Sequence, residues 1–332
     1  MAGRVTIAEL ARRSGVSKGT VSRALNGYRD VSPATRARVA AVARELGYEP
    51  DAGARTLRTR RSMLAGAYLG RCAGDTTQPF FRAVLAGLGE RLGARGYGLM
   101  VIEGTGDLRP LRRGALDGAV VMCVDPDDPV VTAIAAAGLP AVGVDVELAA
   151  HVAADHRGGT ALAVRHLARL GHRRIAHVAG ILHTLAGRER LAGYRAGLAA
   201  AGLPYDPALV ATGDFSLAYG AAAGAAVLAA GPTAVVAASD LMAVGVTRAA
   251  AARGLRVPDD VSVVGFDDLP LAALVEPGLT TVRQDSGRIG AAAADALVAR
   301  MQGAEGGRRT VIPVDLTVRA STARREPPES PA

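Results

Sequence analysis

The chain has 332 residues, more than one hydrophobic core usually serves, and at about 100–200 residues per domain this length predicts two or three domains. No uncharged apolar run approaches the roughly 18 residues of a membrane span, and the N-terminal MAGRVTIAELARR has no apolar signal core, which argues against a membrane protein and favours the cytoplasm. The formal net charge of +8 lies in the first 61 residues, where 13 Lys and Arg face 5 Asp and Glu, so this segment suits a polyanionic partner.

The N-terminal segment predicts three helices. In TIAELARRSGVSKGTVSRALNG, Thr6 and Glu9 form a capping box, in which Thr6 accepts from the backbone and Glu9 reaches back to the cap. Gly15 supplies a tight turn, and Ser17 caps a second helix that has its apolar residues on one face. A third helix, within VSPATRARVAAVARELG, closes a small core. This is a helix-turn-helix pattern.

The second helix of such a motif enters the major groove of DNA. Its first-turn residues, and those one turn later, point at base edges: Lys18, Gly19 and Arg23. Short polar groups suited to phosphates surround them: Ser17, Thr20, Ser22 and Asn26. Arg23 can bond guanine with two donors, and Lys18, the only lysine of the chain, can donate to guanine or a phosphate. A lysine at a helix start opposes the helix dipole, which favours a functional role over a solvated one.

The remaining sequence, about residues 62–322, predicts an α/β fold. Short apolar runs such as GAVVMCV, RIAHVAG and VSVVGF alternate with alanine-rich amphipathic helices. This alternation is typical of parallel sheets covered on both faces. Ligands of such sheets bind beyond the carboxyl ends of the strands.

Ordered motifs run through nearly the whole chain, over roughly residues 4–322: VTIAELARRSGVSKGTVSRALNG, QPFF, RERLAGYRAGL, PTAVVAASDLMAVG, GLRVPDDVSVVGFDD, PGLTTVRQD and LTVRAST. Together they resemble the LacI/GalR family of bacterial transcription regulators. The resemblance implies an N-terminal all-α helix-turn-helix headpiece followed by an α/β periplasmic-binding-protein-like domain of two parallel-sheet subdomains.

The domain boundaries that the resemblance implies follow the motifs. The headpiece would span residues 1–48, a hinge 49–61, and an effector-binding and dimerisation domain 62–322, followed by a flexible tail at 323–332. Within the large domain, subdomain 1 would comprise about 62–155 and 287–312, and subdomain 2 about 156–283 and 313–321.

The resemblance also implies which side chains bind an effector in the cleft between the subdomains. Phe80 and Phe81 would line one wall, and Phe215 would stack on the ring of the effector from the other. Three polar residues match family positions that bond effector hydroxyls or polar ring atoms: Arg190, Asp240 and Asp267. For Asp267 a structural ion pair or a turn cap is the alternative.

The hinge sequence PDAGARTL would fold, by the same resemblance, into a short helix in the minor groove of the operator. Ala54 and Leu57 fit this role, and Leu57 would wedge into a base step. Asp51 and Gly53 depart from the family pattern, because a carboxylate repels phosphates and glycine disfavours a helix.

The function predicted is a sequence-specific DNA-binding transcriptional repressor, acting as a homodimer on a pseudo-palindromic operator. A small sugar-like or nucleoside-like effector in the cleft would control its affinity for DNA. A solute-binding protein or a sugar-modifying enzyme on the same α/β fold is the alternative. The first has no use for a helix-turn-helix, and the second needs a base or nucleophile that no motif supplies.

Neither a catalytic residue nor a cofactor or metal site is predicted. The histidines of the central region fall on different sides of helix, turn and strand: His166, His172, His177 and His183. Segment 104–115 is too short for the helix that the family usually has there, which affects the expected dimer surface.

Overall fold

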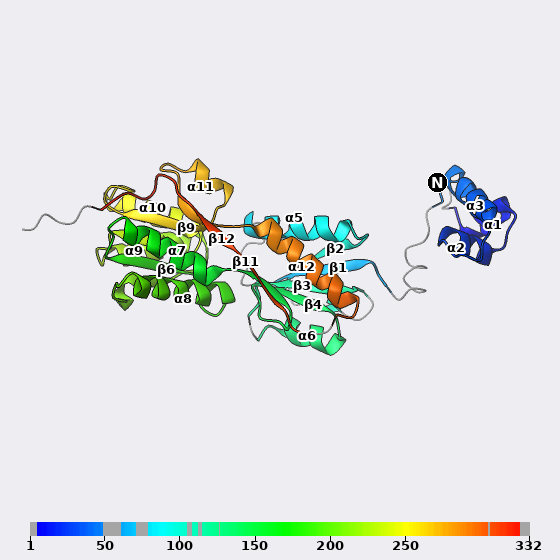
Figure 1. The fold of residues 1–332 in the computed structure, drawn as a ribbon, viewed down its shortest axis with the longest axis horizontal. Coiled ribbons are helices and arrows are strands. Elements are labelled where there is room, and N and C mark those ends of the chain that lie inside the picture. Colours follow the sequence, from blue (N-terminus) through cyan, green and yellow to red (C-terminus); the bar gives the residue numbers. More distant parts are fainter. Residues whose placement is uncertain are drawn as a thin grey trace, which may run out of the picture. The chain divides into compact units, whose positions relative to one another are not determined.

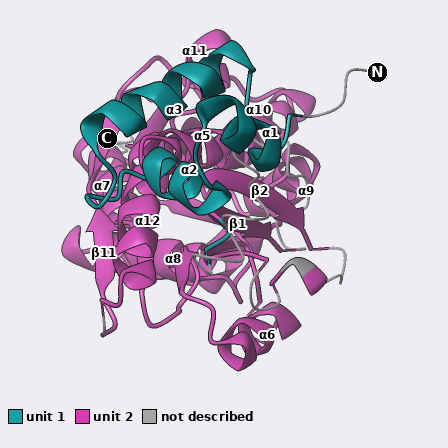
Figure 2. Cartoon of the chain, turned by 90° about the vertical axis from the view of Figure 1, so that its right-hand side faces the viewer, with its two compact units in different colours: residues 1–62 teal, residues 63–332 magenta. Residues whose placement is uncertain are grey.

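The computed structural model describes residues 5–48, 61–70, 79–104, 108–111, 115–125, 127–304 and 306–325. The chain divides into two units, residues 1–62 and 63–332 (Figure 2). The hinge residues Ala54 and Leu57 lie outside the described residues, as do Asp51, Gly53 and the tail beyond residue 325.

The first unit is a bundle of three helices: α1 (Ile7–Ser14), α2 (Lys18–Leu25) and α3 (Pro33–Glu45). Thr6, Ser17 and Ser32 cap them, each hydroxyl accepting a hydrogen bond from a backbone amide three residues on. The capping box predicted for α1 is only half formed. The Glu9 carboxylate pairs with Arg12 at 2.5 Å instead of reaching back to the cap.

The turn between α1 and α2 needs a left-handed residue, which Gly15 supplies with φ of 65°. The three helices then bury one apolar cluster, whose fully buried members are Leu10, Val21 and Val39. This core leaves the opposite face of α2 exposed to solvent.

The second unit contains two six-stranded sheets (Figure 1). The first sheet is parallel throughout, in the order β11 (Arg309–Ile312), β5 (His151–Ala154), β4 (Ala141–Val144), β3 (Gly118–Met122), β1 (Leu64–Leu69) and β2 (Gly98–Glu103). The second has the order β12 (Val314–Thr317), β10 (Thr280–Gln284), β9 (Ser262–Asp267), β8 (Ala234–Ala237), β6 (Ile175–Ala179) and β7 (Val210–Thr212). In the second sheet, only the edge strand β12 is antiparallel to its neighbour.

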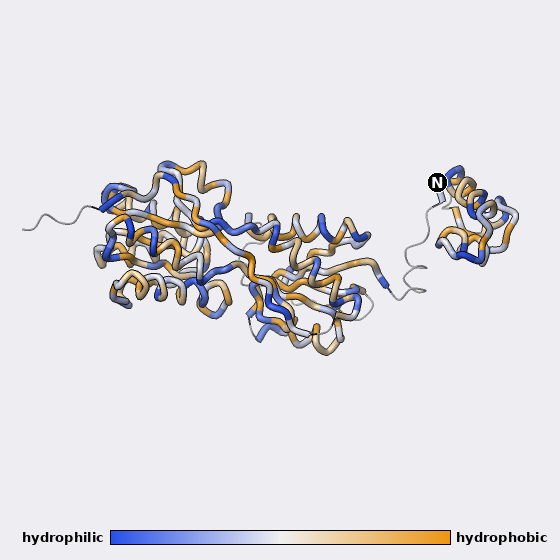
Figure 3. Tube along the Cα trace, viewed as in Figure 1, coloured by the Kyte–Doolittle hydropathy of each residue, from blue (hydrophilic) through white to orange (hydrophobic). Residues whose placement is uncertain are grey.

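Helices cover both faces of each sheet. Those of the first sheet are α5 (Pro79–Gly93), α12 (Ser286–Met301) and α6 (Pro129–Ala137). Those of the second are α7 (His156–Arg169), α8 (Leu185–Ala200), α9 (Leu217–Leu228), α10 (Asp240–Ala252), α11 (Pro270–Leu274) and the single turn η3 (Pro207–Leu209). The strands carry the apolar residues that these helices bury (Figure 3).

Glycine allows two of these helices to pack closely. A Cβ added at Gly290 of α12 would lie 2.0 Å from the carbonyl oxygen of Val84 in α5.

Between β2 and β3, the described residues form only the single 3-10 turn η2 (Arg109–Leu111), where a full helix would have covered the edge of the first sheet. None of the helices described is long and apolar enough to span a bilayer.

The chain passes between the two sheets three times. It crosses after β5, after β10, and at Pro313 between β11 and β12. Loops that follow the parallel strands of both sheets therefore meet in one cleft, as expected for ligand sites of open α/β sheets. Both halves of this cleft belong to the second unit.

Candidate functional site

The exposed face of α2 carries the residues predicted to read bases. Lys18, Gly19 and Arg23 are all exposed, and Lys18 makes no hydrogen bond or ion pair with any described residue. A Cβ added at Gly19 would meet only the Ser17 hydroxyl, at 3.6 Å, so the fold itself does not require glycine there. This leaves a short patch with two cationic side chains and a bare backbone between them.

The four short polar residues around this patch are placed differently from one another. Ser17 is committed to capping, because its hydroxyl accepts from the Thr20 amide at 3.1 Å and contacts the Thr20 hydroxyl at 2.9 Å. The Asn26 amide donates to the Ser22 carbonyl at the other end of α2. All four lie at least partly exposed around the same helix, where phosphates could reach them. Their phosphate-binding role stays a prediction.

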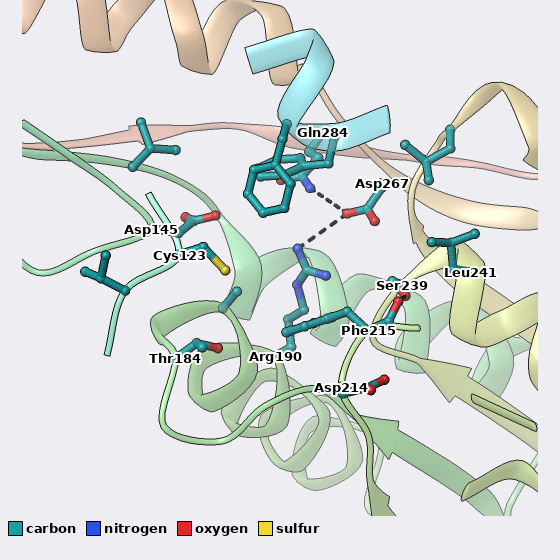
Figure 4. Close-up of a pocket in the computed structure, with 16 residues that line it drawn as sticks. Cys123, Asp145, Thr184, Arg190, Asp214, Phe215, Ser239, Leu241, Asp267 and Gln284 are labelled. Atoms are coloured by element: carbon teal, nitrogen blue, oxygen red, sulfur yellow. Dashed lines mark hydrogen bonds and ion pairs between the residues drawn. The ribbon is translucent and has the colours of Figure 1, made fainter. Parts of the chain in front are cut away.

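The cleft of the second unit forms a pocket of about 790 Å³, its open mouth included (Figure 4). This size lies within the usual range for small-molecule sites. Loops after strands of both sheets and the start of α5 and α8 form its walls, with these residues: Phe80, Phe81, Cys123, Val124, Val144, Asp145, Thr184, Ala186, Arg190, Asp214, Phe215, Ser239, Leu241, Asp267, Leu269 and Gln284.

Strained backbone concentrates on these walls. Among described non-glycine residues, six have positive φ, and four of the six line the pocket: Cys123 (52°), Asp145 (53°), Phe215 (68°) and Asp267 (117°). Such conformations persist only where the surroundings over-determine them, and they are typical of ligand clamps. Each turns a side chain into the cleft at or just after a strand end.

Arg190 is the centre of the polar network. Its guanidinium is buried, stacks on the ring of Phe266 at 3.7 Å, and donates to the carbonyl of Ala238. A second donor points at the carboxylate of Asp267, 3.5 Å away, as Figure 4 shows. Burial lowers the pKa of Arg190, and the carboxylate of Asp267 opposes that shift.

A histidine links Arg190 to the other subdomain. The Nε of Arg190 donates to Nδ1 of His156 at 3.3 Å, and the Nε2 of this ring lies 2.8 Å from Asp145. Because Nδ1 accepts, the proton of the neutral ring is on Nε2, which donates to Asp145. The chain Asp145–His156–Arg190–Asp267 thus runs from the end of β4, across the cleft, to the end of β9.

The aromatic side chains lie where the resemblance implied. Phe80 and Phe81 of α5 form an edge-to-face pair at 5.2 Å on one wall of the pocket, and Phe215 lines it from the other subdomain. The ring of Phe215 lies against Gly180, where an added Cβ would come within 2.1 Å of it. Gly180 therefore sets how far the ring of Phe215 can retreat from the cleft.

Asp240 lies behind the wall of the pocket and does not line it. The side chain is fully buried, and its carboxylate accepts from the Leu269 amide at 2.7 Å and from the Thr281 hydroxyl at 2.5 Å. Ser239, one residue earlier, lines the pocket in its place. The expected position of Asp240 on the pocket wall is therefore wrong in this structure, where its carboxylate instead holds the loop that carries Leu269.

Two carboxyl groups of this region have raised pKa values. Burial raises the pKa of Asp267 to about 6, against the opposing effect of Arg190. Burial, and then the negative charge of Asp267, raise the pKa of Asp240 well above its usual range. Of the two, Asp267 lines the pocket, and it can change charge state near its pKa of about 6.

Sequence reasoning missed several polar lining residues: Asp145, Thr184, Asp214, Ser239 and Gln284. Thr184 and Ser239 stand just before helix starts, Gln284 ends β10 and Asp145 follows β4, and such positions are the signal that could have pointed to them. Gln284 is 4% exposed and donates to Asp267 at 2.5 Å, while its own carbonyl oxygen has no partner among the residues described. A buried acceptor without a partner is suited to a ligand donor.

None of the four histidines named in the sequence analysis lines the pocket. His177 is buried in β6, where burial lowers its pKa to about 4, and it stacks on Tyr194 at 4.9 Å. His166 and His172 bond the C-terminal segment at Thr322 and at the carbonyl of Ala323. Across the described part of the chain, no group of three His, Cys, Asp or Glu side chains is arranged to hold a metal ion.

Comparison with known proteins agrees with this arrangement. Residues 6–51 match the model of bacterial regulatory proteins of the lacI family, and residues 164–322 match a periplasmic binding protein-like domain. The HTH-type transcriptional regulator CelR of Thermobifida fusca is 38% identical, with 97% of this chain and 98% of CelR covered. The ribose operon repressor of Escherichia coli K12 is 33% identical over 89% of this chain and 93% of its own.

Solved structures show the same fold over almost the whole chain. A lac repressor dimer bound to operator and the anti-inducer ONPF gives a TM-score of 0.84 at 31% identity, covering 97% of this chain and all of its own. A CelR–cellobiose complex gives 0.76 at 36% identity, covering 96% and 100%. The predicted fold class and the resemblance are both confirmed, and the chain belongs to the LacI family of bacterial regulatory proteins.

Proposed function

We propose that the protein is an operator-binding transcriptional repressor whose affinity for DNA depends on a neutral, hydroxyl-rich effector held in the cleft. Its first unit supplies the exposed cationic face of α2, and its second unit supplies the pocket. The family relatives support this combination, since they are named as transcriptional regulators and repressors. For the same reason we infer that the chain is not an enzyme and acts in the cytoplasm.

The chemical class of the effector is inferred from an excess of hydrogen-bond acceptors in the pocket. Among the described residues that line it, three are carboxylates, Asp145, Asp214 and Asp267, and one is a cation, Arg190. Arg190 already serves Asp267, Ala238 and His156, so it has little capacity left for an anion. A neutral ligand with many O–H donors satisfies these acceptors, whereas a phosphate or carboxylate would be repelled.

The aromatic walls of the pocket also favour a sugar ring as the ligand. Phe80 and Phe81 on one side and Phe215 on the other offer flat apolar surfaces to the faces of a ring. A sugar ring has apolar C–H faces and a polar hydroxyl rim, which matches this division of the pocket. Relatives are consistent with it, because one is a complex with cellobiose and another a structure with bound ribose. A nucleoside fits the aromatic surfaces but brings base acceptors to an acceptor-rich site.

Thermal unfolding with a panel of ligands tests the effector class. We expect a neutral mono- or disaccharide to raise the melting temperature, since a ligand that binds only the folded state stabilises it. The phosphate ester of the same sugar is the matched control and should leave the melting temperature unchanged. A shift with the phosphorylated sugar, or with nucleosides alone, would contradict the assignment.

The homodimer is tested separately. A lac repressor relative is a dimer on its operator, and a dimer would present two copies of α2 to the two halves of a pseudo-palindrome. Sedimentation at micromolar concentration should give twice the monomer mass. A monomer at that concentration, with or without a palindromic duplex, would contradict this part of the proposal.

A further inference from the structure

An acidic residue stands beside the helix that faces DNA. Oδ2 of Asp30 lies 3.5 Å from Nη1 of Arg23, and both side chains are about half exposed, at 55% and 52%. The other two acids of residues 5–48, Glu9 and Glu45, pair with Arg12 and Arg13 at the other helices. Asp30 is therefore the acid of this stretch that pairs with a base-reading residue.

The backbone around Asp30 is anchored on both sides. Before it, the amide of Tyr28 donates to the carbonyl of Arg23 at 3.1 Å. After it, Val31 is buried, and Nη2 of Arg36 bonds the carbonyls of Tyr28 and Val31 at 3.0 and 3.2 Å. The loop from α2 to α3 thus fixes the backbone of Asp30 relative to the end of α2, and the ion pair with Arg23 orients its carboxylate.

This position gives Asp30 a cost and a possible benefit in DNA binding. A carboxylate near phosphates lowers affinity for every DNA sequence. A guanidinium, however, has five donors in a rigid fork, and an acceptor at Nη1 leaves Nε and Nη2 free along one edge. That free edge matches O6 and N7 of guanine, so a fixed carboxylate on the other side would orient Arg23 for bidentate contact.

We propose that Asp30 is a positioning residue that sets the base preference of Arg23 while lowering affinity for DNA in general. The inference rests on the proposed function, in which α2 reads operator bases. It assigns to the loop between α2 and α3 a role in selectivity that charge alone would not suggest. Affinity and selectivity should therefore change in opposite directions when the carboxylate is removed.

The test uses the full-length protein and the variant Asp30→Asn, which keeps the shape and removes the charge. Base preference is read by selection from a library of randomised duplexes, and affinity for the selected and a random duplex is measured against salt. We expect the affinity ratio between the two duplexes to fall at least about fivefold, the size of a weak single mismatch. Preference at one base pair per half-site should flatten, and affinity for the random duplex should rise.

The matched control is Glu45→Gln, which removes the same charge from the pair with Arg13 at 2.9 Å. It should change affinity for both duplexes alike and keep the ratio within about twofold, because general electrostatics does not read sequence. In an Arg23→Ala background, Asp30→Asn should have no further effect on base preference. Thermal unfolding of each variant shows whether the headpiece stays folded.

Two results would overturn the inference. One is an Asp30→Asn protein that keeps its base preference and affinity ratio. The other is a loss of preference from Asp30→Asn that persists when Arg23 is already alanine. A failure of the proposed function looks different, since the wild-type protein would then enrich no sequence from the library.

Discussion

At the scale of single residues, the pocket is defined by groups that are buried and linked in a chain. Asp145, His156, Arg190 and Asp267 pass hydrogen bonds across the cleft, and their backbones at Asp145 and Asp267 are in left-handed conformations. Three of the predicted contacts, Arg190, Phe215 and Asp267, line the pocket, and the resemblance to the family pointed to each of them. Gln284 ends β10 and Asp145 follows β4, but which strand ends meet at the cleft depends on strand order, which the sequence alone does not give.

The raised pKa of Asp267, about 6, leads to a prediction about stability and pH. Its ordinary value is 3.8, so between about pH 4 and 6 the folded state binds a proton that the unfolded state has lost. The contribution of this group to the free energy of unfolding is then lost as pH rises through that window, by about 3 kcal/mol in all. The difference in stability between wild type and Asp267→Asn should fall by most of this amount from pH 4 to 6.5.

Urea unfolding at intervals across this range measures that difference. Carboxylates with lowered pKa values, such as Asp295 and Asp260, change stability in the opposite direction but are common to both proteins. They therefore cancel in the comparison. A difference that stays constant with pH would show that Asp267 titrates at its ordinary value.

Gly180 provides a second prediction at this scale. Its backbone conformation accepts any residue, but an added Cβ would meet the ring of Phe215 at 2.1 Å. Gly180→Ala should push this ring into the cleft and weaken effector binding about tenfold or more, because misplacing a wall of a pocket affects all of its contacts. Calorimetric titration measures the loss, and DNA affinity without effector should be unchanged.

The control for Gly180→Ala is an alanine at another glycine with an ordinary backbone. Gly202 is unsuitable, because its φ of 65° strains any side chain, whereas Gly19 and Gly89 have ordinary backbones. Gly89→Ala meets only a leucine methyl, at 3.6 Å, and should leave effector affinity at the wild-type value. If Gly180→Ala and Gly89→Ala bound the effector equally well, Phe215 would not form a wall of the site.

At the scale of elements, caps and turns explain which parts were predictable. Thr6, Ser17 and Ser32 start the three headpiece helices where their hydroxyls predict, because capping depends only on local sequence. The start of α10 shows the limit. Successive helical residues point about 100° apart, so a shift of one residue decides whether Ser239 or Asp240 faces the cleft. Tertiary contacts with Leu269 and Thr281 settle this, and they are not visible in the sequence.

Among the residues that the structure describes, three ion pairs join the two subdomains, each with its basic residue in the subdomain of the second sheet. They are His156–Asp145 at 2.8 Å, His183–Asp125 at 2.8 Å and Arg188–Glu147 at 2.5 Å. We expect Glu147→Gln to weaken effector binding about two- to fivefold at low salt, since it removes one exposed ion pair that holds the two walls of the cleft together. The effect should disappear at high salt.

The control for this pair lies within one subdomain. Arg174 and Asp206 are paired at 3.4 Å with both residues on the side of the second sheet, so Asp206→Asn should not alter effector affinity at any salt concentration. An equal effect of Asp206→Asn and Glu147→Gln would mean that general charge, and not closure of the cleft, controls binding.

At the scale of the whole molecule, charge and chemistry are divided between the two units. The first unit carries the full excess of positive charge, and residues 62–332 carry 26 basic and 26 acidic residues. The boundary near residue 62 could be placed from charge and motifs. The segment between the units could not be tested in the same way, because Ala54 and Leu57 lie outside the described residues, and their minor-groove role stays a prediction.

This division predicts how a truncated protein behaves. A fragment of residues 62–332 should keep the full effector-induced rise in melting temperature, because every residue lining the pocket lies within it. It should lose DNA binding altogether, since its remaining charges cancel and α2 is absent.

In the full chain, the logarithm of DNA affinity should fall linearly with the logarithm of salt concentration, with a slope of about 0.9 per phosphate contacted. Fluorescence anisotropy with a labelled duplex measures both proteins under one set of conditions. DNA binding by the fragment with the same salt slope would place the polyanion contact in the α/β unit and remove the basis for assigning it to the headpiece.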